Sequence, residues 1–70
     1  MKVTMKLFEV RENKKISMNQ LSKQSGVAYS HIWRIENENR IPSITVLCRL
    51  AVALDVEPQE LFEYSHGGRI

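Results

Sequence analysis

Residues 26 to 40, GVAYSHIWRIENENR, bring together side chains suited to recognising a ligand. The segment holds the only tryptophan of the chain and one of its two tyrosines, with one histidine and two arginines. On a helix, the apolar residues Ala28, Ile32 and Ile35 lie within about 40° of one direction. The opposite arc, from about 100° to 240°, carries Tyr29, Ser30, Trp33, Arg34 and Asn37. Such a helix would bury its aliphatic face and expose its aromatic and polar one.

The groups on the exposed face have a common use in nucleic-acid recognition. A guanidinium can bond guanine at two atoms, hydroxyl and amide groups reach base edges or phosphates, and apolar groups contact thymine methyls. An alternative is that Trp33 packs over a neighbouring helix or against a second copy of the chain.

The charge distribution favours a polyanionic partner for the first half of the chain. Residues 1 to 40 carry eight cations and four glutamates, whereas residues 41 to 70 carry two arginines and four acids. The net charges are therefore +4 and −2, although the chain as a whole is only +2. Such asymmetry points to an anionic partner; an ordinary solvated charged surface is the alternative.

Composition argues against an enzyme. A chain of 70 residues makes one small domain and leaves no room for a deep catalytic cleft. Paired carboxylates, a nucleophile with a base and a phosphate-binding loop are all missing from the sequence. Cys48 has no disulfide partner, and His31 and His66 lack metal-ligand spacing. We expect no catalysis, metal, cofactor or small-molecule substrate, and we expect Cys48 to be a core residue.

The sequence also predicts a cytoplasmic protein without a membrane segment. No apolar run approaches the roughly 20 residues that a spanning helix needs. The N-terminal residues MKVTMKLFEV lack the apolar block and cleavage site of a signal peptide.

Helix start and stop signals predict five helices and no strand. The first covers residues 4–13, and the second, capped by Ser17 with Gln20 in a capping box, ends at Gly26. The third covers 28–37 and ends before Pro42. Ser43 caps a fourth over 44–54, and Pro58 opens a short fifth that includes Phe62. The expected fold is an all-α, compact five-helix bundle with a helix-turn-helix, a single domain over 1–70 with its core region at 4–63 and a C-terminal tail at 64–70.

The apolar faces of these helices predict one shared core. We expect it to contain Leu7, Val10, Ile16, Leu21, Val27, Ile32, Ile35, Ile44, Leu47, Leu50, Leu54, Val56, Leu61 and Phe62. Arg11 shares the inward face of the first helix with Leu7, and Glu36 lies at about 80° on the wheel of the third, at the edge of its buried side. We expect these two charges to form a structural ion pair; two independent surface charges are the alternative.

Two helices separated by Gly26 and Val27 form a tight helix-turn-helix, and residues 7–62 resemble the phage-repressor and Cro-like helix-turn-helix (Xre) family of DNA-binding transcriptional regulators. The matching stretches are VREN, QLSKQSGVAYSHIWRIEN, RIPSITVLCRLAVALDV and PQELF. The resemblance implies that residues 28–37 form the recognition helix in the major groove. It also implies the Arg11 to Glu36 pair.

Several residues depart from the family pattern. Met18 replaces a phosphate-contacting glutamine, so that contact is either lost or replaced by one from Asn19. Ser22 replaces an alanine and needs a carbonyl partner for its hydroxyl. Lys15 and Glu38 stand where glycines are usual, and Asn39 can adopt the left-handed turn.

These observations predict sequence-specific double-stranded DNA binding by a transcriptional regulator, a repressor, at a palindromic operator. The base-reading residues would be Tyr29, Ser30, Trp33 and Arg34. The phosphate-contacting residues would be Ser17, Asn19, Asn37, Asn39 and Arg40. We expect a weak homodimer built from the fourth and fifth helices and the tail, with candidates Val52, Pro58, Leu61 and 64–70.

The alternative function is a protein-interaction module of the same fold, such as an antitoxin or an adaptor. Its surface would include Phe8, Ile41 and Val52.

Overall fold

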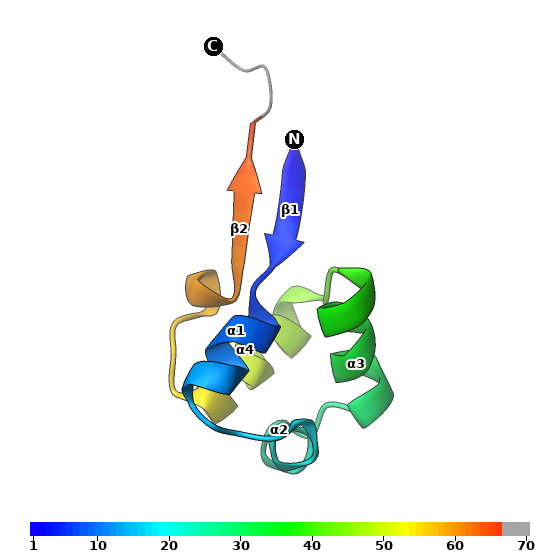
Figure 1. Ribbon diagram of the computed structural model, residues 1–70, viewed down its shortest axis with the longest axis vertical. Coiled ribbons are helices and arrows are strands. Elements are labelled where there is room, and N and C mark those ends of the chain that lie inside the picture. Colours follow the sequence, from blue (N-terminus) through cyan, green and yellow to red (C-terminus); the bar gives the residue numbers. More distant parts are fainter. Residues whose placement is uncertain (67–70) are drawn as a thin grey trace.

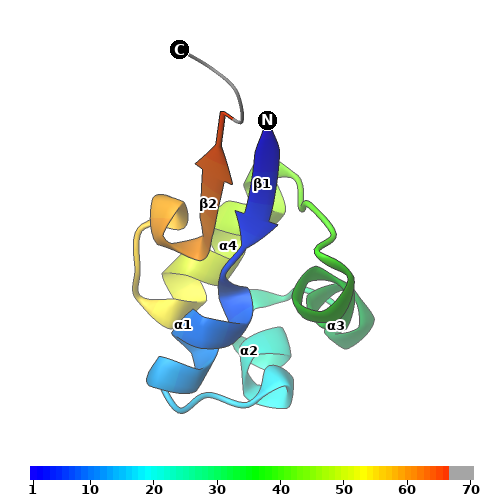
Figure 2. The same cartoon turned by 45° about the horizontal axis from the view of Figure 1, so that its top comes forward.

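The computed structural model describes residues 1–66. Within this range the order of elements is β1 (Lys2–Met5), α1 (Leu7–Asn13), α2 (Met18–Ser25), α3 (Tyr29–Glu38), α4 (Ile44–Leu54), the 3-10 helix η1 (Pro58–Leu61) and β2 (Phe62–Ser65). The helices form a body, and β1 and β2 form a ribbon that extends from it (Figure 1). A view turned by 45° shows the same division, with α3 on one flank of the body (Figure 2).

Local capping residues begin and end the helices as the sequence predicts. Ser17 Oγ accepts a hydrogen bond of 3.1 Å from the Gln20 amide, and the Ser17 amide donates one of 2.9 Å to Gln20 Oε1. Ser43 Oγ accepts one of 3.2 Å from the Val46 amide at the start of α4. These bonds satisfy amide groups that have no partner inside a helix.

Left-handed backbone follows three of the helices at residues other than glycine. Lys15, Asn39 and Asp55 have φ values of 58°, 52° and 58°. A residue in this conformation turns the chain out of a helix and is usually glycine. Asn39 therefore adopts the left-handed conformation that its type allows, and Lys15 adopts it where the family pattern has glycine.

The ribbon corrects the expected all-α fold. β1 pairs antiparallel with β2, with Lys2 opposite Ser65 and Met5 opposite Phe62. The predicted first helix over 4–13 is therefore wrong at its start, because residues 2–5 alternate in polarity like a strand. The fifth helix is wrong as well, since η1 is a single 3-10 turn and Phe62 belongs to β2.

The body encloses one apolar core. Its ten buried apolar residues are Leu7, Leu21, Val27, Ile32, Ile35, Leu47, Leu50, Ala51, Leu54 and Leu61. Ala51 is the one member absent from the predicted set. Four other predicted residues, Val10, Ile16, Val56 and Phe62, are partly buried and pack against this core.

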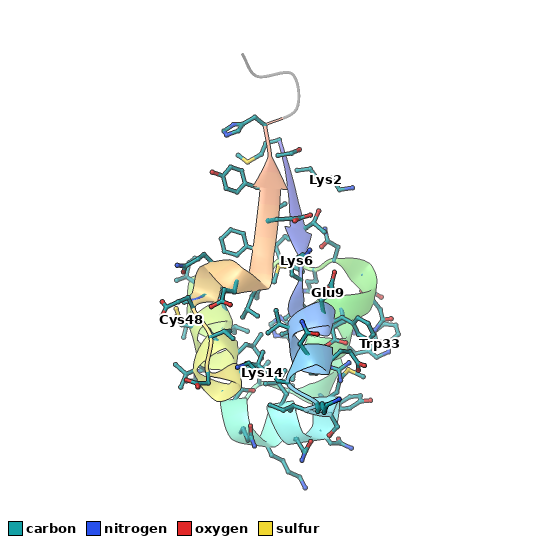
Figure 3. All side chains as sticks on the ribbon, turned by 60° about the vertical axis from the view of Figure 1, so that its left-hand side comes forward. Lys2, Lys6, Glu9, Lys14, Trp33 and Cys48 are labelled. Carbon is teal, nitrogen blue, oxygen red and sulfur yellow. The ribbon has the colours of Figure 1, made fainter. Side chains whose placement is uncertain are left out.

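Two core predictions on α4 are wrong. Ile44 is 74% exposed, and Cys48 is exposed too. Together with Val52 they are spaced four residues apart and share one side of the helix. The apolar arc of α4 is thus wider than the part that packs on the body, and these three residues lie outside the packed part. Cys48 lies on the side of the molecule opposite Trp33 (Figure 3).

Candidate nucleic-acid interface

The turn between α2 and α3 is fixed by backbone conformation and by two serine hydroxyls. Gly26 has φ 74°, and an added Cβ would meet Arg49 Nη1 at 3.5 Å, an ordinary contact. Left-handed backbone, rather than crowding, therefore selects glycine here. Ser22 Oγ donates a hydrogen bond of 2.6 Å to the Val27 carbonyl, and Ser25 Oγ accepts one of 3.1 Å from the Val27 amide. The hydroxyl of Ser22 has the carbonyl partner that it needs.

α3 presents two different faces. Ile32 and Ile35 are buried in the core, whereas Tyr29 and Trp33 are 44% and 43% exposed. Ser30 and Arg34 are exposed beside them. The four predicted base-reading residues therefore lie together on the solvent side of one helix, available to a partner.

Trp33 also borders a groove between α3 and α1. The groove has a volume of about 720 Å³ and is lined by Met5, Phe8, Glu9, Arg11, Met18, Trp33, Glu36 and Asn37. Trp33 and Glu9 lie on the same side of the molecule (Figure 3). The indole is therefore partly packed beside α1 and partly open to solvent, so that it combines features of both expected environments.

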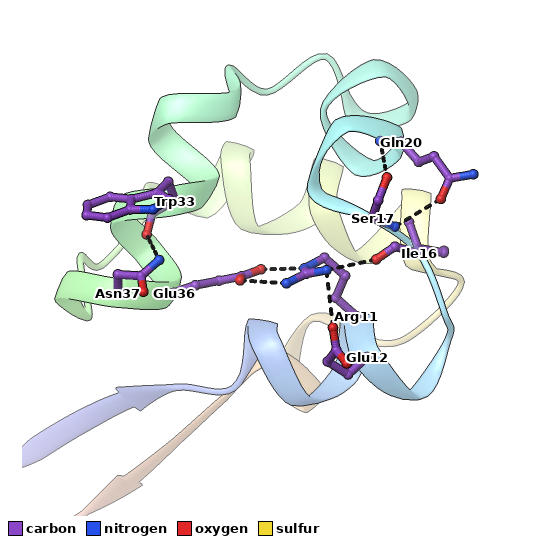
Figure 4. Close-up of polar contacts among 8 residues, drawn as sticks. All are labelled: Arg11, Glu12, Ile16, Ser17, Gln20, Trp33, Glu36 and Asn37. Atoms are coloured by element: carbon purple, nitrogen blue, oxygen red, sulfur yellow. Dashed lines mark hydrogen bonds and ion pairs between the residues drawn. The ribbon is translucent and has the colours of Figure 1, made fainter.

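A buried ion pair connects α1 to α3. Arg11 Nε and Nη2 donate to the two carboxylate oxygens of Glu36 at 2.7 and 2.9 Å (Figure 4). Arg11 Nη1 donates a hydrogen bond of 3.0 Å to the Ile16 carbonyl in the loop before α2. The hydrogen bond to Glu36 raises the pKa of Arg11 above its ordinary value, against the desolvation that lowers it.

This pair orients the exposed face of α3. The side chains of Arg11 and Glu36 are only 8% and 3% exposed, so water screens them little. Bidentate geometry restricts both rotation and sliding of α3 relative to α1. Arg11 and Glu36 therefore form an ion pair and are not two independent surface charges.

The residues proposed for phosphate contact differ in what their side chains already do. Ser17 Oγ accepts a capping bond but keeps its own proton to donate. Asn37 Nδ2 donates a hydrogen bond of 3.0 Å to the Trp33 carbonyl within α3 (Figure 4). Asn19 and Arg40 are exposed at the start of α2 and beyond the end of α3.

The side chain of Asn39 makes two hydrogen bonds that were not predicted from the sequence. Its Oδ1 accepts a hydrogen bond of 2.8 Å from the Met5 amide, and its Nδ2 donates one of 2.9 Å to the Val3 carbonyl. The side chain thus joins the end of α3 to β1, while Nδ2 keeps a second proton with which it could bond a phosphate. The alternating polarity of residues 2–5 and 62–65 was the signal for this neighbouring strand.

Metal-binding clusters and membrane-spanning helices are both absent from the described part of the chain. No group of three or more His, Cys, Asp or Glu side chains among residues 1–66 could hold a metal ion. No helix in that range is long and apolar enough to cross a membrane.

Known proteins resemble this chain in sequence and in fold. Residues 7–61 match the family described as Helix-turn-helix. The uncharacterised HTH-type transcriptional regulator y4dL of Sinorhizobium fredii is 40% identical over 55 residues, which are 79% of this chain and 28% of that protein. The chain thus spans little more than a quarter of this relative.

Two solved structures are similar in fold and sequence. The restriction-modification controller protein C.AhdI of Aeromonas hydrophila has 36% identity and a TM-score of 0.73, over 79% of this chain and 83% of that one. The N-terminal DNA-binding domain of the master biofilm regulator SinR of Bacillus subtilis has 31% identity and a TM-score of 0.70, over 90% and 93%. The chain belongs to the helix-turn-helix family, in its Xre and Cro-like branch.

Proposed function

We propose that this chain binds double-stranded DNA in a sequence-specific way and regulates transcription, with α3 in the major groove. The observation that carries the proposal is the exposed face of α3, which sits on a helix-turn-helix and is oriented by the Arg11 to Glu36 pair. Relatives named as a transcriptional regulator and as a DNA-binding domain support it. In such a motif the second helix enters the major groove.

Within this face, each side chain has a role set by its chemistry. Arg34 can bond guanine O6 and N7 together, and Ser30 can bond to either kind of base edge. Tyr29 and Trp33 can pack against sugars or thymine methyls while retaining a polar group. Specificity would come mainly from Arg34, since a bidentate contact discriminates among bases.

Contacts to phosphates would surround this reading face. Ser17 and Asn19 lie at the start of α2, where unpaired helix amides also favour an anion. Asn37 and Arg40 lie at the far end of α3. These contacts would set the position of the protein on the duplex without specifying sequence.

We further propose repression as the outcome, through a homodimer on a palindromic operator. One short recognition helix reads few base pairs, so a two-fold dimer gains both affinity and specificity. Occupation of an operator by such a dimer would block transcription sterically.

The matched variants Arg34→Ala and Arg40→Ala test DNA recognition. An operator is first selected from random duplexes, and binding to it and to a scrambled duplex is measured at two salt concentrations. Arg34→Ala should cost about 1–3 kcal/mol on the operator and relax preference at one position. Arg40→Ala should weaken both duplexes equally and lower the salt slope by about one unit. Fluorescence of Trp33 reports binding independently, because it is the only tryptophan.

If Arg34→Ala and Trp33→Ala both fold normally and leave operator binding unchanged, α3 does not read DNA. A protein-interaction module would then be the better assignment. The groove beside Trp33, bordered by the half-exposed Phe8, is the observation that favours this second function. Absence of duplex binding at about 0.1 M salt, where phosphate contacts still act, would support it.

A further inference from the structure

We propose that the free edge of β2 is the dimerisation surface of this protein, and that its partner is the β2 strand of a second copy. The two ribbons would join as a four-stranded antiparallel sheet in the order β1, β2, β2, β1. This inference rests on the homodimer of the proposed function and names its interface. Its test uses no DNA, so its failure is separate from a failure of DNA binding.

The β1 edge of the ribbon is already closed. The Met5 amide and the Val3 carbonyl point away from β2, and both bond to the side-chain amide of Asn39, at 2.8 and 2.9 Å. One asparagine thus supplies the acceptor and the donor that a neighbouring strand would supply. A third strand could pair at β1 only after displacing Asn39.

The β2 edge is open along the same length. Residues opposite one another in an antiparallel pair direct their backbone groups either toward each other or both away. Since Val3 and Met5 point away from β2, their opposites Tyr64 and Phe62 point away from β1. The Lys6 amide bonds the Leu61 carbonyl at 2.7 Å, as this alternation requires. None of residues 1–66 bonds to the outward groups of Phe62 or Tyr64.

Charge selects the register of the second strand. In a two-fold antiparallel pairing centred on Glu63, two carboxylates would face each other, which is destabilising. Centring on Tyr64 instead places Glu63 opposite Ser65 of the second copy, and Phe62 opposite its His66. The two Tyr64 residues then exchange both of their outward hydrogen bonds. Pairing centred on Tyr64 is therefore the favoured register.

Pairing would also support an element that is weak alone. The ribbon extends beyond the helices (Figure 1), and an isolated two-stranded ribbon is marginally stable in water. Val3, Met5, Phe62 and Tyr64 lie on one face because side chains alternate along each strand. Four strands would double this apolar face, but strands of four residues offer a short contact beside the roughly 800 Å² per partner of stable complexes. Association should therefore be weak and concentration-dependent.

The other candidate surfaces for a second copy are less suitable. Leu61 is fully buried in its own core and cannot form an interface. On α4, Ile44, Cys48 and Val52 form an exposed apolar row. A two-fold packing of this row about Cys48 would bring Arg49 close to its own copy, and like charges there are repulsive. It would also place the two Cys48 thiols together, so that mild oxidation would crosslink the two copies through a disulfide.

Sedimentation equilibrium without DNA, from about 10 μM to about 1 mM protein, tests the interface. The wild-type chain should show a reversible monomer and dimer. Tyr64→Pro removes an outward amide and no bond to β1, so it should weaken dimerisation at least tenfold with little change in melting. Tyr64→Phe keeps that amide and is the matched control, which should dimerise as the wild type does.

Changes at Ser65 test the register. Ser65→Lys places an ammonium opposite Glu63 of the second copy twice per dimer, and should tighten association by about two- to thirty-fold. Ser65→Glu should weaken it by a similar factor. Ser65 also lies opposite Lys2 in its own ribbon, where the same changes act in the reverse sense. If Ser65→Lys tightens the dimer and Ser65→Glu weakens it, these effects therefore cannot arise from a change in the stability of the ribbon within one chain.

Three results would overturn the proposal. The first is a wild-type chain that is monomeric throughout the concentration range. The second is a Tyr64→Pro variant that folds and dimerises normally. The third is quantitative crosslinking through Cys48 under mild oxidation, which would place the interface on α4.

Discussion

The helical body and the ribbon are held together by different kinds of interaction. In the body, ten buried apolar residues from four α-helices, the α2–α3 turn and η1 share one core, and a buried ion pair crosses from α1 to α3. The ribbon pairs residues 2–5 with residues 62–65, and Asn39 fastens its β1 edge to the end of α3. Burial dominates in the body, whereas backbone pairing dominates in the ribbon.

This difference separates two tasks. Orientation of α3 depends mainly on the ten buried core residues and on Arg11 with Glu36, which all lie outside the ribbon, although Met5 and Phe62 of the ribbon pack against that core. The ribbon can therefore join a second copy without disturbing the face of α3 that would read DNA. Changes in the body should affect folding and recognition together, whereas changes on the outer edge of β2 that leave the packing of Met5 and Phe62 intact should affect mainly association.

Removal of one member of the ion pair should have the largest effect. Glu36→Met keeps the length of the side chain but leaves the guanidinium of Arg11 buried without its carboxylate. Breaking a buried pair in this way costs about 3–5 kcal/mol. Urea denaturation measures the loss of free energy of unfolding.

The double variant Arg11→Met with Glu36→Met provides the control. Replacement of a whole buried pair by apolar residues is often close to neutral, so much of the lost stability should return. Only the double variant also removes the hydrogen bond from Arg11 Nη1 to the Ile16 carbonyl, which makes the recovery incomplete. A single variant as stable as the wild type would contradict the role given to this pair.

Truncation in the core should have the next largest effect. Ile35→Ala and Leu50→Ala remove fully packed side chains and should each cost about 2–5 kcal/mol. Ile44→Ala removes a similar group from a position that is 74% exposed and should change stability by less than about 0.5 kcal/mol. Thermal melting of the three variants compares them directly, and equal losses would mean that the buried face of α4 is assigned wrongly.

The sequence predicts the body well because its signals are local. Ser17 with Gln20, Gly26 and Ser43 each act on amides within a few residues, and each is found in its expected place. The faces of α3 follow from helical spacing, since Ile32 and Ile35 are buried and Trp33 is exposed. Charges on inward faces likewise indicated the pair of Arg11 with Glu36.

The ribbon escaped prediction because its pairing is not local. Each strand has only four residues, too few for period-two alternation to compete with the helical spacing of Leu7, Val10 and Arg11 that follows. Pairing also joins residues about sixty positions apart, such as Val3 with Tyr64, which no local signal encodes. The contact of Asn39 with the ribbon was missed for the same reason, because its two partners lie in β1.

A smaller effect than that of core truncation is expected from separating body and ribbon at Asn39. Asn39→Gly suits the left-handed backbone at the end of α3 and removes only the amide side chain. Two partly exposed hydrogen bonds are lost, each contributing about 0.5–1.5 kcal/mol, while relief at the positive φ offsets part of that loss. Global stability should therefore change by about 1 kcal/mol or less, and hydrogen exchange at the Met5 amide should accelerate several-fold.

Asn39→Asp distinguishes the two bonds of this contact. A carboxylate can still accept from the Met5 amide but cannot donate to the Val3 carbonyl. Exchange at Met5 should therefore stay close to that of the wild type in Asn39→Asp and rise in Asn39→Gly. Met5 exchange that is equally slow in both variants would show that β1 is held by its pairing with β2 alone, and that the two regions are not joined through Asn39.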